Sequence, residues 1–181
     1  ICITTPFPEE MSRKLKAGDS VLITGTIISA RDAAHKAMTE ALAKGEPLPV
    51  DWHDQIVYYL GPTPAKPGDP IGSAGPTTSG RMDAYTPTML AQGIKGMVGK
   101  GSRSPEVVEA MKKHGVTYFA AVGGAAALIA KSVKKYEVVG YPELGPEAVA
   151  KLTVEDFPCI VVIDSEGNNF YEMGQKPYRR L

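Results

Sequence analysis

Residues 20–44, SVLITGTIISARDAAHKAMTEALAK, decide the fold class of this chain. The stretch from Ser20 to Ile28 is apolar and rich in β-branched residues, which predicts a strand buried on both faces. Good helix formers dominate from Ala30 to Lys44, and Gly45 can end that helix in a left-handed turn. This stretch therefore predicts a buried strand that leads directly into a helix.

The same alternation continues along the chain. Strands are predicted at 55–60, 94–98, 116–122, 137–141, 159–164 and 169–172, helices at 86–92, 104–114 and from Gly124 to about 134, a helical turn at 147–151 and a turn at 155–158. Five glycines and five prolines among residues 61–80 predict an ordered, functional loop without a regular element. Alternating strands and helices imply an α/β layered fold, and 181 residues fit a single domain, 1–181.

Composition excludes several classes of function. Lys plus Arg and Asp plus Glu both number 20, so a broad basic face for nucleic acid is not expected. Apolar runs stay well short of the roughly 18 residues of a membrane span, so a membrane partner is not expected either. The two cysteines, Cys2 and Cys159, are too few for the four thiolates of an iron–sulfur cluster. Unpaired thiols fit a reducing, cytoplasmic location, with Cys159 buried in its apolar run.

Three polar segments beside glycines are candidates for chemistry. Segment 24–36 places Arg31, Asp32 and His35 at the start of the predicted helix, where an arginine can help to bind an anion. Segment 72–83 combines small residues, hydroxyls and Arg81 in a plausible cradle for a carboxylate or phosphate. The alternatives are a solvated arginine with a helix-start aspartate in the first segment, and an ordinary capped turn in the second.

The third segment, residues 93–104, holds Lys100 between two glycines just before a capped helix. The spacing of a P-loop is not met, because Gly101 follows Lys100 where Ser or Thr would be needed. An ATPase is therefore excluded on this pattern, and an exposed loop lysine is the alternative to a binding lysine. His53 and His114 lack partners at metal-ligand spacing and are expected at the surface.

Taken together, these segments resemble the class I fumarase family. The resemblance is to the β subunit, or C-terminal domain, of iron–sulfur fumarate hydratases and of L-tartrate dehydratases. It covers nearly the whole chain, and the threonine-pair motif is its most specific part. The motifs that carry it are Thr24-Gly25-Thr26, 30–36 (ARDAAHK), 58–62 (YYLGP), 75–83 (GPTTSGRMD), Gly99-Lys100-Gly101, 123–127 (GGAAA) and 155–158 (EDFP).

The resemblance implies a swivelling β/β/α domain and a hydro-lyase activity, the reversible hydration of fumarate to L-malate. It implies no cofactor bound by this chain, and a 4Fe–4S cluster in a partner α subunit. The implied partners are that subunit, a small dicarboxylate and a second copy of the chain within a heterotetramer. An L-tartrate dehydratase β subunit is one alternative, and a non-catalytic dicarboxylate-binding module is another.

By the same resemblance, Arg31, Arg81 and Lys100 bind the substrate carboxylates and Thr77 acts as the base. A neutral threonine is a weak base, so it needs cations and oriented donors nearby, and an acid from the α subunit is its implied partner. Supporting roles fall to four further residues: Asp32, His35, Thr78 and Asp83. No metal ligand is expected in this chain.

Overall fold

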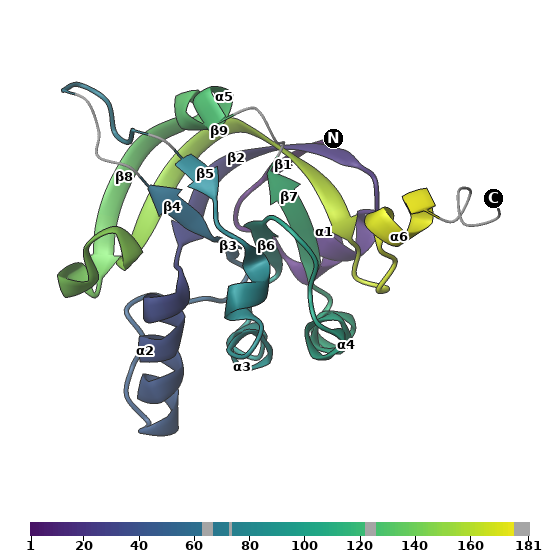
Figure 1. Ribbon diagram of the computed structural model, residues 1–181, viewed down its shortest axis with the longest axis horizontal. Coiled ribbons are helices and arrows are strands. Elements are labelled where there is room, and N and C mark those ends of the chain that lie inside the picture. The colour runs from purple at the N-terminus through teal and green to yellow at the C-terminus, as the bar shows by residue number, and fades with distance from the viewer. Residues whose placement is uncertain (63–66, 73, 122–125, 176–181) are drawn as a thin grey trace.

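Strand β2 (Ser20–Ser29) is the centre of the fold, as residues 20–28 predict. In this computed structural model, which describes residues 1–62, 67–72, 74–121 and 126–175, β2 belongs to a seven-stranded sheet (Figure 1). It pairs in parallel with β1 (Cys2–Thr4) and β3 (Ile56–Tyr58), and antiparallel with β9 (Val149–Ile163). A ten-residue strand with three partners fixes the position of most other elements.

The pairing of the central strands closes into a ring. β3 pairs in parallel with β6 (Gly96–Gly99), and β6 with β7 (Thr117–Ala121). β7 in turn pairs antiparallel with β9, which also pairs with β2. β8 (Val133–Gly140) extends the sheet beyond β9. Since β2, β3, β6 and β7 run in one direction, their carboxyl ends lie at the same end of the ring.

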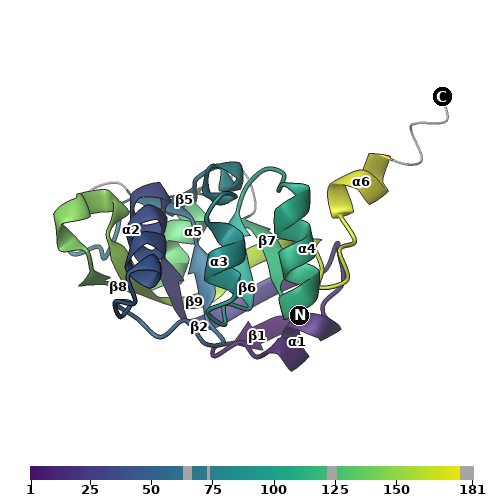
Figure 2. The same ribbon diagram turned by 90° about the horizontal axis from the view of Figure 1, so that it is seen from below.

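Helices cover one face of this sheet. α2 (Asp32–Ala43), α3 (Thr86–Leu90) and α4 (Pro105–His114) lie side by side in both views (Figure 2), and α5 (Ala126–Ser132) lies on the opposite side in Figure 1. The remaining short elements are α1 (Glu9–Lys14), α6 (Phe170–Gln175), and the 3-10 helices η1 (Ser79–Met82) and η2 (Pro142–Glu147). No helix of the described segments is long and apolar enough to cross a membrane.

The sheet separates two apolar cores. One core, on the side of α5, packs the rings of Tyr58, Phe119 and Phe157. The other lies beneath the three helices and includes Tyr59 and Tyr118. Neighbouring residues of β3 and of β7 thus enter different cores, because successive side chains of a strand point to opposite faces. This double burial is why the strands look continuously apolar in the sequence.

Start and stop signals in the sequence correctly locate α4. The Ser104 hydroxyl accepts a hydrogen bond from the Val107 amide at 3.4 Å, and Gly115 ends the helix with a φ of 68°. α2 ends near Gly45, where φ is 72°, but it starts at Asp32 rather than at Ala30. The reason is that the Ala30 amide still donates to the Tyr58 carbonyl and extends the strand pairing.

Three sequence predictions in the C-terminal third are wrong. Residues 147–151 are not a helical turn, because β9 begins at Val149 and its pairing with β2 and β8 overrides the local preference for helix. Residues 155–158 are not a turn but an irregularity within β9, where Asp156 has a φ of 52°. Residues 169–172, predicted as a strand, fall mainly in helix α6.

Two further predictions need smaller corrections. The strand predicted at 137–141 exists but begins earlier, at Val133. The loop at 61–80 does contain regular structure, since β4 (Leu60–Pro62) and β5 (Ala74–Pro76) form a two-stranded antiparallel sheet and η1 follows. The mixed α/β class is confirmed. Gly123-Gly124 lies outside the described residues.

Gly25 is a point where only glycine fits, and this generates a stability prediction. Its φ is 127°, and an added Cβ would collide with the Thr5 Oγ1 that accepts a hydrogen bond from the Thr26 amide. We expect Gly25→Ala to lower the free energy of unfolding by about 2–4 kcal/mol, through backbone strain and overpacking. Denaturant unfolding of both proteins measures this difference.

Gly45→Ala is the matched control. Gly45 also has a left-handed φ, 72°, but has no atom within 4 Å of an added Cβ. This substitution should cost only about 1 kcal/mol of backbone strain. Equal losses in the two variants would show that the contact with Thr5 does not constrain β2.

Candidate functional site

The sequence-predicted site residues gather where the parallel strands end. Arg31 follows β2 and caps the amino end of α2, and Lys100 follows β6 directly. Thr77 follows β5, and its amide donates to the Tyr59 carbonyl, just beyond β3, at 2.7 Å. The carboxyl ends of parallel strands are where both closed and open α/β sheets commonly bind their ligands.

Gly61 brings Thr77 and Arg31 close to one another. An added Cβ at Gly61 would lie 3.3 Å from Thr77 Oγ1 and 3.9 Å from Arg31 Nη1. The threonine hydroxyl and the guanidinium group therefore approach the same piece of backbone. A side chain at this position would fill the space between them, so Gly61 keeps that space open.

Asp32 connects Arg31 to Arg81. Arg81 Nε donates to Asp32 Oδ2 at 2.8 Å, which orients the arginine of the threonine-pair segment toward the start of α2. Two buried polar atoms at this place, Arg31 Nε and Asp32 Oδ1, have no hydrogen-bond partner among the described residues. Buried polar groups are nearly always paired in folded proteins, so these two atoms mark a place where a polar partner fits.

Lys100 is held beside the threonine pair. Thr78 and Lys100 form an isolated parallel bridge, and Ser79 exchanges two hydrogen bonds with Lys100. The Ser79 amide donates to the Lys100 carbonyl at 2.9 Å, and the Lys100 amide donates to Ser79 Oγ at 3.1 Å. The side chains of Thr78 and Lys100 remain exposed. Their backbone is thus fixed while both side chains stay available for contact.

Two of the predicted supporting residues are tied into the protein itself. Asp83 accepts hydrogen bonds from Arg103 Nε at 2.7 Å and from the Ser104 amide at 2.9 Å. His35 is buried, and its Nδ1 lies 2.8 Å from the Arg31 carbonyl, which is an acceptor, so this nitrogen donates. Asp83 therefore contacts the elements behind the site, and His35 contacts the backbone of Arg31.

Burial lowers the pKa of His35 to about 4, against the hydrogen bond to Arg31, which favours the charged form. The imidazole edge packs on the Tyr59 ring, with 5.5 Å between ring centroids. Removal from water disfavours a charged imidazolium, so the ring is neutral in the folded protein near pH 7. His35 is consequently a fixed, uncharged neighbour of the Arg31 backbone.

Sequence reasoning missed the groups that hold these segments together. Ser79, Tyr59, Tyr118 and Arg103 received no role, although all four are buried behind the predicted site residues. A buried hydroxyl pair, Ser79 Oγ and Tyr118 Oη at 2.8 Å, joins the threonine-pair loop to β7. The sequence signal for Arg103 is weak: it directly precedes Ser104, which caps α4, and an arginine at such a position ordinarily has a solvent-exposed side chain.

The cysteines do not fit an iron–sulfur cluster. Cys2 is exposed in β1 and Cys159 is buried in β9, and burial raises the pKa of the Cys159 thiol. Within the described segments, no group of three or more His, Cys, Asp or Glu side chains is placed to hold a metal ion. The residues of this chain that are described therefore offer such a cluster no set of ligands. His53 is exposed, as predicted.

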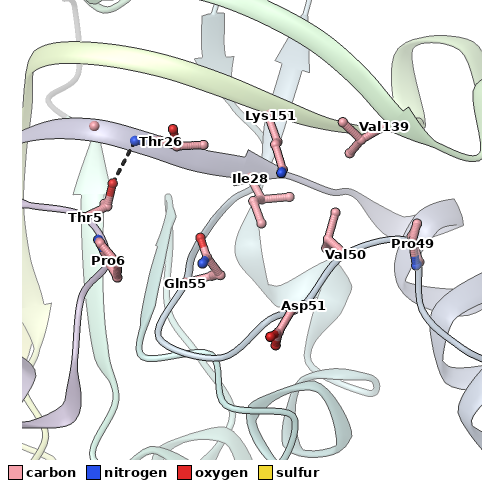
Figure 3. A pocket seen from close by; sticks show the side chains of 11 residues that line it. Thr5, Pro6, Thr26, Ile28, Pro49, Val50, Asp51, Gln55, Val139 and Lys151 are labelled. Atoms are coloured by element: carbon pink, nitrogen blue, oxygen red, sulfur yellow. Dashed lines mark hydrogen bonds between the residues drawn. The ribbon is translucent and has the colours of Figure 1, made fainter.

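An open depression of about 800 Å³ lies away from the predicted site. Figure 3 shows its lining, which includes Thr26, Gln55 and Lys151 and none of the predicted site residues. Gln55 precedes β3, whereas Tyr59 and Gly61 follow it. The depression is thus at the amino end of β3, and the predicted site residues gather at its carboxyl end.

The chain is similar to known proteins over most of its length. A family model described as "Fumarase C-terminus" matches residues 1–174. The chain is 46% identical over 155 residues to an aerobic class I fumarate hydratase of Salmonella typhimurium, covering 84% of the chain and 27% of that protein. It is 45% identical over 156 residues to fumarate hydratase 2 of Leishmania major, covering 85% of the chain and 28% of that protein.

A third similar protein is matched over most of its own length. A Methanocaldococcus jannaschii protein, named as a candidate L(+)-tartrate dehydratase subunit beta, is 44% identical over 176 residues. That alignment covers 93% of the chain and 90% of the archaeal protein. The chain thus spans little more than a quarter of the fumarate hydratases and nearly the whole of this subunit.

The buried His35 predicts how stability depends on pH. Its pKa is lower in the folded protein than the ordinary value of 6.5, so the unfolded chain binds the proton more tightly. The contribution of neutral His35 to the free energy of unfolding is therefore complete above pH 6.5, and about 3 kcal/mol of it is lost as the pH falls to 4. Denaturant unfolding between pH 7 and pH 4 measures this slope of unfolding free energy against pH.

His35→Phe should flatten this slope, because the titrating group is gone. His53→Gln, which removes an exposed imidazole, is the control for the loss of a histidine, and the pH dependence of unfolding should be flatter in His35→Phe than in this control. An unchanged slope in His35→Phe would show that His35 does not titrate as a buried neutral group.

Proposed function

Because the chain belongs to the Fumarase C-terminus family, we propose that it supplies part of the active site of a class I fumarate hydratase. Such an enzyme is a hydro-lyase that adds water reversibly to fumarate to give L-malate. The part of the fumarate hydratases that this chain does not span would supply the rest of the site. We also assign the mixed α/β fold more narrowly, as a swivelling β/β/α domain.

The proposed partner is an iron–sulfur α subunit. The name of the archaeal relative includes "subunit beta", which supports an enzyme of more than one subunit. In this proposal the α subunit holds a 4Fe–4S cluster, two copies of each chain form a heterotetramer, and the enzyme is cytoplasmic. The cluster supplies a Lewis acid for the substrate, and the residues described here act beside it.

One observation carries the proposal: four candidate groups from three segments of the sequence meet at one end of the sheet. The side chains of Thr77 and Arg31 both approach Gly61. The Asp32 carboxylate, next to Arg31 in the sequence, forms an ion pair with Arg81. The bridge between Thr78 and Lys100 adds the lysine. Three cations beside a hydroxyl are a suitable environment for a small dianion.

The cations match the charges of the proposed substrate. Fumarate and malate each carry two carboxylates, and a guanidinium group can bind a carboxylate with two parallel hydrogen bonds. The Arg81 side chain is 56% exposed, so it is accessible to a ligand, and its Nε is held by Asp32. Its orientation is therefore fixed before the substrate arrives, which lowers the entropy cost of binding.

Thr77 is the proposed base. In the direction from malate, Thr77 Oγ removes the proton from C3, and the electron pair left on C3 delocalises into the adjacent carboxylate. Arg31, Arg81 and Lys100 stabilise that developing charge, the C2–O bond then breaks, and the hydroxyl leaves with one proton as water, which gives fumarate. Nearby cations also stabilise an alkoxide on threonine, which a neutral environment would not. An acid from the α subunit is its proposed partner for the proton.

An L-tartrate dehydratase β subunit is the second candidate function. The archaeal relative supports it, because the alignment covers nearly the full length of both proteins. Tartrate differs from malate by one hydroxyl, so the same three cations would bind its carboxylates. The choice between the substrates depends on contacts with that additional hydroxyl.

Turnover by the assembled enzyme tests the proposal. The chain and its α subunit, combined without oxygen and with the cluster reconstituted, should dehydrate L-malate with a higher kcat/KM than L-tartrate. The reverse preference would favour the tartrate dehydratase. Binding of fumarate to the chain without turnover of either substrate in the complex would favour a non-catalytic binding module and contradict the proposal.

Substitution of the threonine pair tests the proposed base. Thr77→Val keeps the branched shape and removes only the hydroxyl. We expect kcat of the assembled enzyme to fall by about 10²–10⁴, the usual effect of losing a general base. KM should change far less, because Arg31, Arg81 and Lys100 still bind the carboxylates. Steady-state kinetics with malate measures both constants.

Thr78→Val is the matched control, since the two threonines are adjacent and differ in position. It should reduce kcat much less than Thr77→Val, while assembly with the α subunit stays intact in both variants. An inactive Thr78→Val beside a nearly normal Thr77→Val would move the base by one residue. Full activity in both would show that the base comes from the partner subunit.

A further inference from the structure

Arg103 is a buried cation that lies outside the proposed set of substrate-binding and catalytic residues. It lies between β6 and α4, and its side chain is 0% exposed. The guanidinium carbon lies 5.2 Å from the centre of the Tyr59 ring and 5.1 Å from that of Tyr118. Removing a charge from water is costly unless it is paired and hydrogen-bonded. Its partners therefore indicate why the charge is kept.

All three guanidinium nitrogens of Arg103 have partners. Nε donates to Asp83 Oδ1 at 2.7 Å, and Nη2 donates to Thr86 Oγ1 at 2.9 Å. Both Nη atoms lie 3.3 Å from the Tyr59 hydroxyl, and Nη1 also lies 3.4 Å from Met97 Sδ. A single planar group thus joins the segment after η1, the start of α3, the end of β3 and the middle of β6.

The Asp83 and Tyr59 contacts lead to three of the proposed substrate residues. Asp83 directly follows η1, the 3-10 helix that carries Arg81. Tyr59 accepts the Thr77 amide on its carbonyl, and its ring packs against His35, which holds the Arg31 carbonyl. Each of these connections passes through one intermediate residue or two.

The contact with Tyr118 leads to the fourth proposed substrate residue, Lys100. Tyr118 donates its hydroxyl to the Gly101 carbonyl at 2.9 Å and also contacts Ser79 Oγ, which accepts the Lys100 amide. The Tyr118 ring lies against the Arg103 guanidinium. Arg103 itself also follows Lys100 by three residues in the same loop.

We propose that Arg103 is a positioning residue, which holds the loops of Thr77, Arg81 and Lys100 in register behind the site. Arg103 forms hydrogen bonds to none of these three residues and acts through Asp83, Tyr59 and Tyr118. A lysine could keep the charge but could not make this planar set of contacts at once. The inference rests on the proposed function for its consequence in catalysis, and on the contacts alone for its consequence in structure.

The test uses Arg103→Lys in the assembled enzyme. Amide hydrogen exchange should become faster in peptides that cover residues 77–83 and 99–103, and exchange in α1 should change little. With malate, kcat/KM should fall by about tenfold, a typical coupling between linked residues. Arg13→Lys is the matched control, because Arg13 is a half-exposed arginine paired with Glu9 on a distant helix. It should change neither quantity.

A double-mutant cycle separates positioning from general stability. If Arg103 acts by placing Lys100, Arg103→Lys should lower kcat/KM by less than about twofold in a Lys100→Ala background. Should Arg103→Lys fail to fold, Tyr59→Phe gives the same test, because it removes only the hydroxyl that both Nη atoms contact. Its expected effects have the same direction and are smaller.

The two hypotheses fail in different ways. If the unaltered complex turns over neither malate nor tartrate, the proposed function is wrong, and hydrogen exchange still tests the inference. If exchange and kcat/KM are unchanged in Arg103→Lys, the positioning role is wrong. If both single substitutions lower kcat/KM and their effects multiply in the double mutant, Arg103 does not place Lys100, and that part of the inference is wrong.

Discussion

The pairing of β2 with β9 is the interaction on which the rest of the structure depends. β9 runs antiparallel to β2 along nearly its whole length and also pairs with β7 and β8, so it closes the parallel strands into a ring. Closure buries apolar side chains on both sides of the strands, which gives two cores instead of one. It also fixes the carboxyl ends of β2, β3 and β6 beside one another, and the candidate site residues lie where these strands end.

Polar contacts then tie the segments of the candidate site residues to one another at that common end. The Asp32 carboxylate orients Arg81, Ser79 fixes the backbone of Lys100, and Gly61 leaves space between Thr77 and Arg31. Behind these segments, the buried guanidinium group of Arg103 is paired with Asp83. In our proposal, its contacts hold the loops of the site residues in place.

Local sequence signals predicted the parts of the fold that depend on local structure. Ser104 and Gly115 bound α4 as expected, and the run at 20–28 gave β2 its correct place. The failures came where distant pairing decides the outcome: residues 147–151 have helix-favouring side chains, but Val149, Ala150 and Lys151 lie in β9 because β2 and β8 pair with them. For the site, the resemblance supplied Thr77, Arg81 and Lys100, and the structure brings their segments together. Arg103 could not be predicted, because its burial depends on β6, α3 and α4 packing together.

A structure of the assembled enzyme with bound malate or fumarate tests the central claim most directly. Arg31, Arg81 and Lys100 should contact the two carboxylates, with C3 of the ligand next to Thr77 Oγ. The α subunit should cover this end of the sheet. A dicarboxylate bound instead in the depression at the amino end of β3, beside Thr26 and Lys151, would contradict the proposed site.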